Sequence, residues 1–248
     1  MKLFLIIFII LIFSLLITFL FSKTKYITNY VYNQENIVPV ISFTSLIFSL
    51  LLGLTISNLW NRYIHIKELI NINTARTKNL YFMTIGYPDT IEIRKNIKKY
   101  VENVINVEYQ SLKKGKIMFD NKYFKNIMLS INNYALRNPQ SLLAPSLYEI
   151  LPERGTLRTI LKEKDNYLLI LIIICSIISM VGFWFIKNHN SNIQFIVDYG
   201  IISTIIICIF LIYNLLNPFS GLFEISIEPY KNLLNTFKNI DNETKVPI

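Results

Sequence analysis

The sequence predicts an all-α membrane protein with four transmembrane helices and a long cytoplasmic helical segment between the second and the third. The 248-residue chain is 52% hydrophobic, and its mean hydropathy is +0.41. Charged residues are absent from four long stretches and crowded between them, whereas a soluble domain of this size mixes charge throughout. No alternating pattern typical of a strand occurs in the sequence. Together these observations favour a bundle of membrane helices over a soluble fold.

Four apolar stretches are long enough to span a bilayer, which takes about 20 residues for roughly 30 Å of hydrocarbon. They cover residues 3–21, 37–61, 166–186 and 199–223. The first contains only Ser14 and Thr18 as mild polar interruptions, and it exceeds the ~7–15 apolar residues of a cleavable signal peptide. We therefore expect it to be retained. Asn217 and Pro218 should end the fourth helix before its apolar stretch ends.

The distribution of Lys and Arg predicts the orientation. Residues 62–165 hold 18 Lys and Arg against 10 Asp and Glu. With four spans, this segment and both termini lie on one side, which collects 22 of the 25 basic residues. Basic residues concentrate in cytoplasmic loops, so that side is predicted to be cytoplasmic. The net charge of +9 reflects this asymmetry and gives no reason to expect a nucleic-acid partner.

The expected organisation follows from the spans and the charges. Residues 1–61 form a first transmembrane hairpin and residues 62–165 a cytoplasmic helical segment. Residues 166–223 form the second hairpin, and residues 224–248 a cytoplasmic C-terminal tail. The chain is thus predicted to be a multi-pass integral membrane protein with both termini in the cytoplasm.

Within the cytoplasmic segment we expect several helices. The second span meets no turn residue until Gly86, so its helix should continue to about Thr84. Asp89 is expected to cap a new helix, with Glu92 completing a capping box, and that helix should run to about Leu112. An apolar stripe predicts a further helix over residues 121–136. Residues 140–165 should be helical but interrupted, at the positions Pro145, Pro152 and Gly155.

The sequence carries no signature of enzyme chemistry. The predicted spans contain no ionisable residue, which weighs against a proton relay but is compatible with a channel closed by an apolar constriction. His65 and His189 are the only histidines, and neither has the spacing of a metal ligand. No Gly-rich phosphate loop occurs. We therefore expect no catalytic residue, metal or cofactor.

Basic residues line one side of the predicted helix that begins near residue 90. A solvated helix face explains them, and contact with anionic headgroups or an anion vestibule is the alternative. These residues are Arg94, Lys95, Lys98 and Lys99.

Two local motifs are more specific. The first closes the second span with aromatic and polar residues suited to a membrane interface. It comprises Asn58, Trp60, Asn61, Arg62 and Tyr63. The second follows the fourth span, where Pro218 stops the helix and Gly221 permits a reversal. It comprises Asn217, Pro218, Phe219 and Gly221.

These motifs resemble the end of the second helix and the Asn-Pro-Phe-Gly turn of bestrophin channels. The chain is more similar still to a bestrophin-like family of small membrane proteins, which shares a Gly-Leu segment followed by Asn-x-Trp-x-Arg-Tyr and a Pro-Phe-x-Gly turn. The resemblance implies a homo-oligomer, pentameric as in bestrophins, that passes chloride or similar small anions across the lipid bilayer. Its pore would be lined by the second transmembrane helix. An ungapped placement from Trp60 puts Ser42, Leu46 and Leu50 at the constriction.

The sequence also departs from the bestrophin pattern. Calcium-activated bestrophins carry an acidic run just after the turn, whereas only Glu224 and Glu228 occur here, and two separated glutamates do not supply the six to eight oxygens of a calcium site. Calcium control is therefore not expected. The alternative to a channel is a non-conducting membrane protein whose cytoplasmic helices dock a protein partner. An exposed apolar groove on residues 90–137 would favour that alternative.

Overall fold

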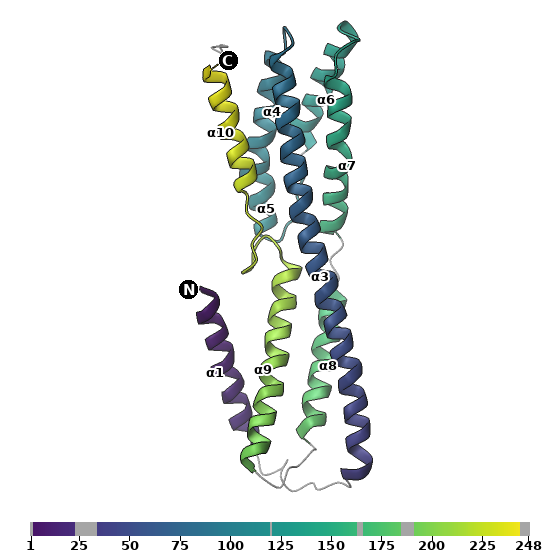
Figure 1. Cartoon of the computed structure of the whole chain (residues 1–248), viewed down its shortest axis with the longest axis vertical. Coiled ribbons are helices and arrows are strands. Elements are labelled where there is room, and N and C mark those ends of the chain that lie inside the picture. The colour runs from purple at the N-terminus through teal and green to yellow at the C-terminus, as the bar shows by residue number, and fades with distance from the viewer. Residues whose placement is uncertain (1, 23–33, 120, 163–165, 185–190, 244–248) are drawn as a thin grey trace. The chain divides into compact units, whose positions relative to one another are not determined.

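The computed structural model describes residues 2–22, 34–119, 121–162, 166–184 and 191–243. These residues form helices joined by turns and short connections, and no strand occurs among them (Figure 1). The chain divides into two compact units. The first comprises Met1–Asn61 and Asp165–Leu216, and the second comprises Arg62–Lys164 and Asn217–Ile248. The prediction of an all-helical protein is confirmed.

The first unit is built from apolar helices. It contains α1 (Lys2–Ser22), the part of α3 (Gln34–Ile85) up to Asn61, α8 (Asn166–Trp184) and α9 (Ser191–Leu216). Both α1 and α8 pack against α9. A Cβ added at Gly182 in α8 would lie 3.6 Å from Ile41 of α3, an ordinary van der Waals contact, so these two helices are neighbours here.

Two described helical segments are long and apolar enough to cross a membrane. They are Val38–Ile85 within α3 and Asn192–Leu216 within α9, and only 22% of the most apolar stretch of each is buried. The core helix of a soluble protein would be mostly buried, so this exposure suits lipid or another subunit instead. Shorter apolar segments cover Phe8–Leu20 in α1 and Leu169–Gly182 in α8.

Helix α9 differs from the predicted fourth span. It begins at Ser191 rather than near Tyr199, so Asp198 lies inside the helix, where Gln194 donates a 3.0 Å hydrogen bond to its carboxylate. The apolar helical segment Asn192–Leu216 therefore includes Asp198, which lies just before the predicted span of residues 199–223. Its end at Leu216, directly before Asn217, is as predicted, because Pro218 cannot continue a helix.

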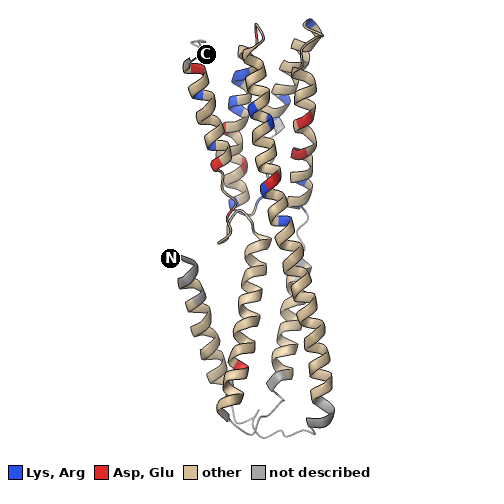
Figure 2. Ribbon diagram, in the orientation of Figure 1, with Lys and Arg blue, Asp and Glu red and all other residues tan. Residues whose placement is uncertain are grey.

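The second unit is a bundle with its own hydrophobic core. It contains α3 from Arg62, α4 (Ile91–Asn103), a π-helical turn η1 (Val104–Glu108), α5 (Tyr109–Lys113), α6 (Asn121–Arg137), α7 (Leu143–Lys162) and α10 (Glu228–Glu243). Helix α6 packs on α4 and α7, and α10 packs on α4 and η1. Lys and Arg are spread over these helices together with Asp and Glu (Figure 2).

Helix α3 supplies one wall of this core. It runs without a break to Ile85, as predicted from the absence of turn residues. Tyr81 stacks on Phe237 of α10 with ring centroids 3.9 Å apart, and its hydroxyl donates a 2.6 Å hydrogen bond to Asp241. Lys98 of α4 pairs with the same carboxylate. Contacts between three helices thus meet at Asp241.

The start of α4 corrects the predicted capping box. Asp89 has φ 59°, in the left-handed region, whereas an N-cap residue usually has extended φ and ψ. Thr90 occupies the N-cap position, but its hydroxyl donates to the carbonyls of Thr84 and Tyr87 instead of capping the helix. The preceding turn therefore fixes where α4 begins.

Helix α7 is continuous where an interruption was expected. Pro145 is its third residue, where the missing N–H has no intrahelical partner in any case. Pro152 frees the carbonyl of Tyr148, whose residue is exposed. Gly155 lies inside the helix with open space around the position of a side chain. None of the three residues ends the helix, because packing of its buried face maintains it.

The helix predicted to run from about residue 90 to Leu112 instead contains a π-turn. Residues Ile91–Asn103 and Tyr109–Lys113 are α-helical, and Val104–Glu108 form the wider turn between them. The extra residue lets the consecutive side chains of Glu108 and Tyr109 both face the interior, where they are 3% and 5% exposed. Such turns often occur at functional sites.

Candidate functional site

The three residues predicted to line a pore lie on the open side of α3 in the first unit. Ser42, Leu46 and Leu50 are all exposed, the two leucines by 62% and 60%. The side of the helix that packs inside the unit carries different residues, which are Ile41, Leu52, Thr55 and Leu59. No described residue of this chain covers the predicted pore positions.

A stripe of small residues, three serines and a glycine, marks the same open side of α3. Ser42, Ser49, Gly53 and Ser57 are spaced by seven, four and four residues, which places them on one face of a helix, and all are exposed. A serine hydroxyl forms no hydrogen bond with lipid hydrocarbon, whereas it can bind water in a lumen or lie in a tight contact between helices. This serine stripe therefore favours a pore or subunit surface over a lipid-facing one.

The interface motif spans the boundary between the two units along α3. Asn58, Trp60 and Asn61 are exposed, Trp60 by 41%. Arg62 donates a hydrogen bond to the carbonyl of Ile160 at the end of α7. Tyr63 packs against the core of the second unit. The motif is thus divided between exposed residues and residues that anchor α3 in the bundle.

The turn after α9 is fixed by hydrogen bonds within the second unit. The amide of Ser220 donates to the carbonyl of Asn217 at 3.1 Å, and the amide of Ile225 donates to that of Pro218 at 2.8 Å. Phe219 is buried and meets the ring of Tyr109 edge-on, with centroids 5.8 Å apart. Gly221 lies in the same turn.

Glu224, which follows this turn, is already paired. Lys113 lies 2.5 Å from its carboxylate oxygen, and the hydroxyl of Tyr109 lies 2.8 Å from the same atom. The hydrogen bonds from Lys113 and then Tyr109 lower the pKa of Glu224. Burial raises the pKa of Tyr109, and its hydrogen bond to Glu224 raises that pKa further. Among the described residues, no group of three or more His, Cys, Asp or Glu side chains is placed to hold a metal ion.

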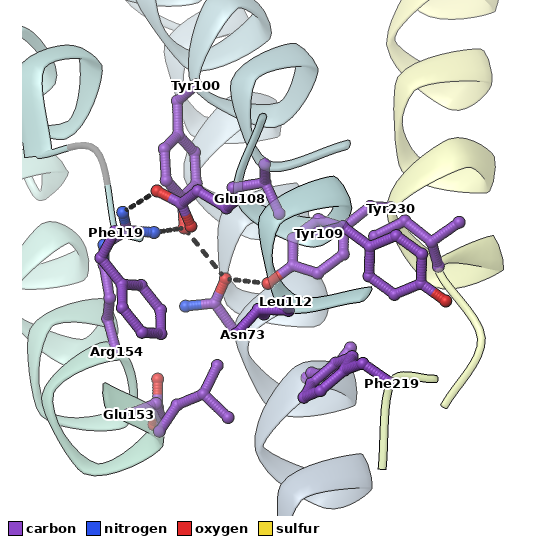
Figure 3. A pocket seen from close by; sticks show the side chains of 14 residues that line it. Asn73, Tyr100, Glu108, Tyr109, Leu112, Phe119, Glu153, Arg154, Phe219 and Tyr230 are labelled. Atoms are coloured by element: carbon purple, nitrogen blue, oxygen red, sulfur yellow. Dashed lines mark hydrogen bonds and ion pairs between the residues drawn. The ribbon is translucent and has the colours of Figure 1, made fainter. Parts of the chain in front are cut away.

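A buried polar cluster forms a second candidate site, which sequence reasoning missed. It surrounds a cavity of about 30 Å³ in the second unit (Figure 3). Arg154 of α7 pairs with Glu108 and donates a 2.9 Å hydrogen bond to the hydroxyl of Tyr100. Asn73 of α3 accepts hydrogen bonds from Tyr100 at 3.3 Å and from Tyr230 of α10 at 2.9 Å. The cluster therefore joins helices α3, α4, α7 and α10 and the π-turn.

Aromatic rings surround the charge of Arg154. Its guanidinium lies 5.0 Å from the ring centroid of Tyr100, 5.4 Å from Phe124 and 5.6 Å from Phe119. Burial disfavours this charge, but the neighbouring Tyr100 and Glu108 outweigh that effect and raise the pKa of Arg154. The ion pair therefore stays charged, and it depends on both partners being present.

One sequence signal could have revealed this cluster. Glu108 lies four residues after Val104, and Arg154 lies four residues after Ile150, so each charge continues an apolar helical stripe. A charged residue at such a position must be paired when its stripe is buried. Glu108 and Arg154 are 46 positions apart in the sequence, so only the folded chain shows that they pair.

The first half of the chain matches a known family. Residues 5–123 match the Bestrophin-like domain. This match contains the first motif and confirms the resemblance to a bestrophin-like family, whereas the turn at residues 217–221 lies outside it. No match was found among curated proteins.

Solved structures share the fold over nearly the whole chain. Crystal structures of variants of a membrane protein superpose with TM-scores of 0.68, 0.65 and 0.63, at sequence identities of 16%, 13% and 15%. They cover 94%, 94% and 96% of this chain, which in turn covers 97%, 96% and 99% of theirs. Residues 5–123 thus match a bestrophin-like domain, and the chain shares its fold with these crystallised membrane proteins.

Proposed function

We propose that this bestrophin-like integral membrane protein is one subunit of a homo-oligomeric channel for chloride or similar anions. Each subunit would cross the bilayer four times, with α1, α3, α8 and α9, and the second unit would form a cytoplasmic helical bundle. Helix α3 would line the pore. A pentamer is the assembly that the resemblance to bestrophins favours.

The observation that carries this proposal is the open face of α3. Its serine stripe is exposed in the single chain, although it lies within a helix long and apolar enough to span a membrane. Symmetric copies arranged around an axis would turn these hydroxyls toward a common lumen. Leu46 and Leu50 beside the stripe would then form an apolar constriction, which imposes a desolvation barrier on an ion.

The proposal is tested by reconstitution in planar bilayers with ion substitution. We expect currents whose reversal potential follows the chloride gradient and does not change when sodium replaces potassium. They should persist in calcium-free solution with a chelator, since Glu224 is held by Lys113 and Tyr109. Cation-selective currents would contradict the anion channel. The absence of current from correctly assembled protein would contradict conduction altogether.

The proposed orientation places residues 62–165 and both termini in the cytoplasm, because 22 of the 25 basic residues lie there. A cysteine at Lys114, exposed in the turn after α5, should react with a membrane-impermeant maleimide only after the cells are permeabilised. Cys175 and Cys208 are replaced by serine beforehand. Labelling of intact cells would reverse the orientation.

The docking alternative gains no support from the hollow between α4 and α6. Its volume is about 360 Å³, and its lining is mostly polar, including Asp89, Asn96 and Asn133. A groove that receives an amphipathic helix needs an apolar floor. This hollow therefore does not favour the docking alternative, and the open face of α3 supports the channel.

A further inference from the structure

A groove between α6 and α7 has the chemistry of a ligand site. Its volume is about 280 Å³, and residues of both helices and of the segment before α6 line it. The floor is apolar, with Phe119, Phe124, Met128 and Leu151. Pockets for small ligands commonly combine such a floor with a few polar groups that fix orientation.

The charge of this groove is positive. Lys125 of α6 and Arg158 of α7 line it and are exposed, and Arg154 lies beneath them with its own charge committed to Glu108. No carboxylate among the described residues lines the groove. Neither Lys125 nor Arg158 forms an ion pair with any of the described residues. Two cations above an apolar floor therefore select for an anion with an apolar body.

Gly155, which lines the groove, helps to keep it open. It lies inside α7, where glycine costs about 1 kcal/mol relative to alanine. A side chain at this position would meet nothing within 4 Å, so neither close packing nor an unusual backbone angle requires glycine. Because Gly155 lines the groove, a longer side chain at this position would reduce the open space there.

We propose that this groove binds a soluble organic anion whose carboxylate pairs with Lys125 and Arg158 and whose apolar body lies on Phe119 and Phe124. Arg158 presents a planar fork that matches a carboxylate. The occupied site would contact Arg154 from the groove while Glu108 holds the same guanidinium within the bundle. The proposal goes beyond ion conduction and does not depend on it.

The test uses the full chain in nanodiscs of phosphatidylcholine with 4-(trifluoromethyl)benzoate as probe, followed by fluorine NMR. A ligand of this size should bind with a Kd on the order of 1 mM. We expect saturable broadening, with one site per chain, and no broadening of the uncharged benzamide analogue. Millimolar inorganic phosphate should not displace the probe, because it lacks an apolar body.

Variants locate the site. Gly155→Leu should fill the groove and weaken binding at least about tenfold, equivalent to about 1.4 kcal/mol. Thr156→Leu adds similar bulk at the next, exposed position of α7 and should leave binding unchanged. The exposed double variant Lys125→Gln/Arg158→Gln should also weaken binding about tenfold, and it keeps the test valid if Gly155→Leu fails to fold.

Three results would overturn the proposal. They are unchanged binding in the double variant, equal binding of the benzamide, and displacement of the probe by phosphate. A fourth result would also overturn it: displacement by phosphatidylglycerol added to the nanodiscs would assign the groove to a lipid headgroup rather than to a soluble anion.

Discussion

Replacing Leu50 with alanine should make the channel leak under conditions in which the parent is closed. In the proposed pore, a ring of Leu46 and Leu50 excludes water, and an ion crossing it loses its hydration. Alanine widens and wets the ring. A barrier lower by about 1.4 kcal/mol corresponds to a tenfold higher rate of passage, so we expect the leak to rise at least about tenfold. Single-channel recording at matched protein levels measures it.

The control for this variant is Leu51→Ala. Leu51 is 44% exposed and Leu50 is 60% exposed, so both substitutions remove the same group from an open position of α3. Leu51 lies about 100° away around the helix, whereas Leu54 lies only about 40° from Leu50 and is a poorer control. Equal leak in Leu50→Ala and Leu51→Ala, or no leak in Leu46→Ala and Leu50→Ala, would remove the proposed constriction.

Replacing Arg154 with alanine should destabilise the second unit by about 3–5 kcal/mol, because it leaves Glu108 charged and buried without its partner. The side chains of Arg154 and Glu108 are only 10% and 4% exposed, so water cannot solvate the charge of Glu108 in place of the lost arginine. The melting temperature of the purified protein should fall by at least about 6 °C. Hydrogen exchange should increase in the π-turn η1 and in α7, which the pair connects.

Two further variants separate the ion pair from general damage to α7. Arg158→Ala removes an exposed arginine from the same helix and should change the melting temperature little. The double variant Glu108→Leu/Arg154→Met replaces both charges by apolar groups of similar size and should recover most of the lost stability. A double variant no more stable than Arg154→Ala would show that the charges are not the cause.

Most of the secondary structure could be predicted from the sequence, because it follows from apolar periodicity and from turn residues. The long α3 follows from an unbroken run of helix-compatible residues up to the turn at Gly86, and the end of α9 follows from Pro218. The resemblance to a bestrophin-like family also rests on local motifs, and the match over residues 5–123 contains the first of them. These features are local, so a single sequence contains them.

The start of α4, the continuity of α7 and the π-turn required the folded chain. Asp is a residue type favoured at helix N-caps, but the turn that joins α3 to α4 holds Asp89 at positive φ. Pro152 and Gly155 disfavour a helix by propensity, and packing of the buried face of α7 overrides them. In α7, packing thus outweighs a local preference of about 1–3 kcal/mol, whereas hydrogen bonds within the preceding turn fix the start of α4.

The two candidate sites divide in the same way. The sequence by itself determined that α3 is apolar and carries Ser42, Leu46 and Leu50 along one side, because helical spacing is a local property. Only the tertiary structure decided that Arg154 pairs with Glu108 and that Gly155 opens a groove. These partners lie on different helices, and burial of a charge becomes favourable only when folding brings its counter-charge into contact.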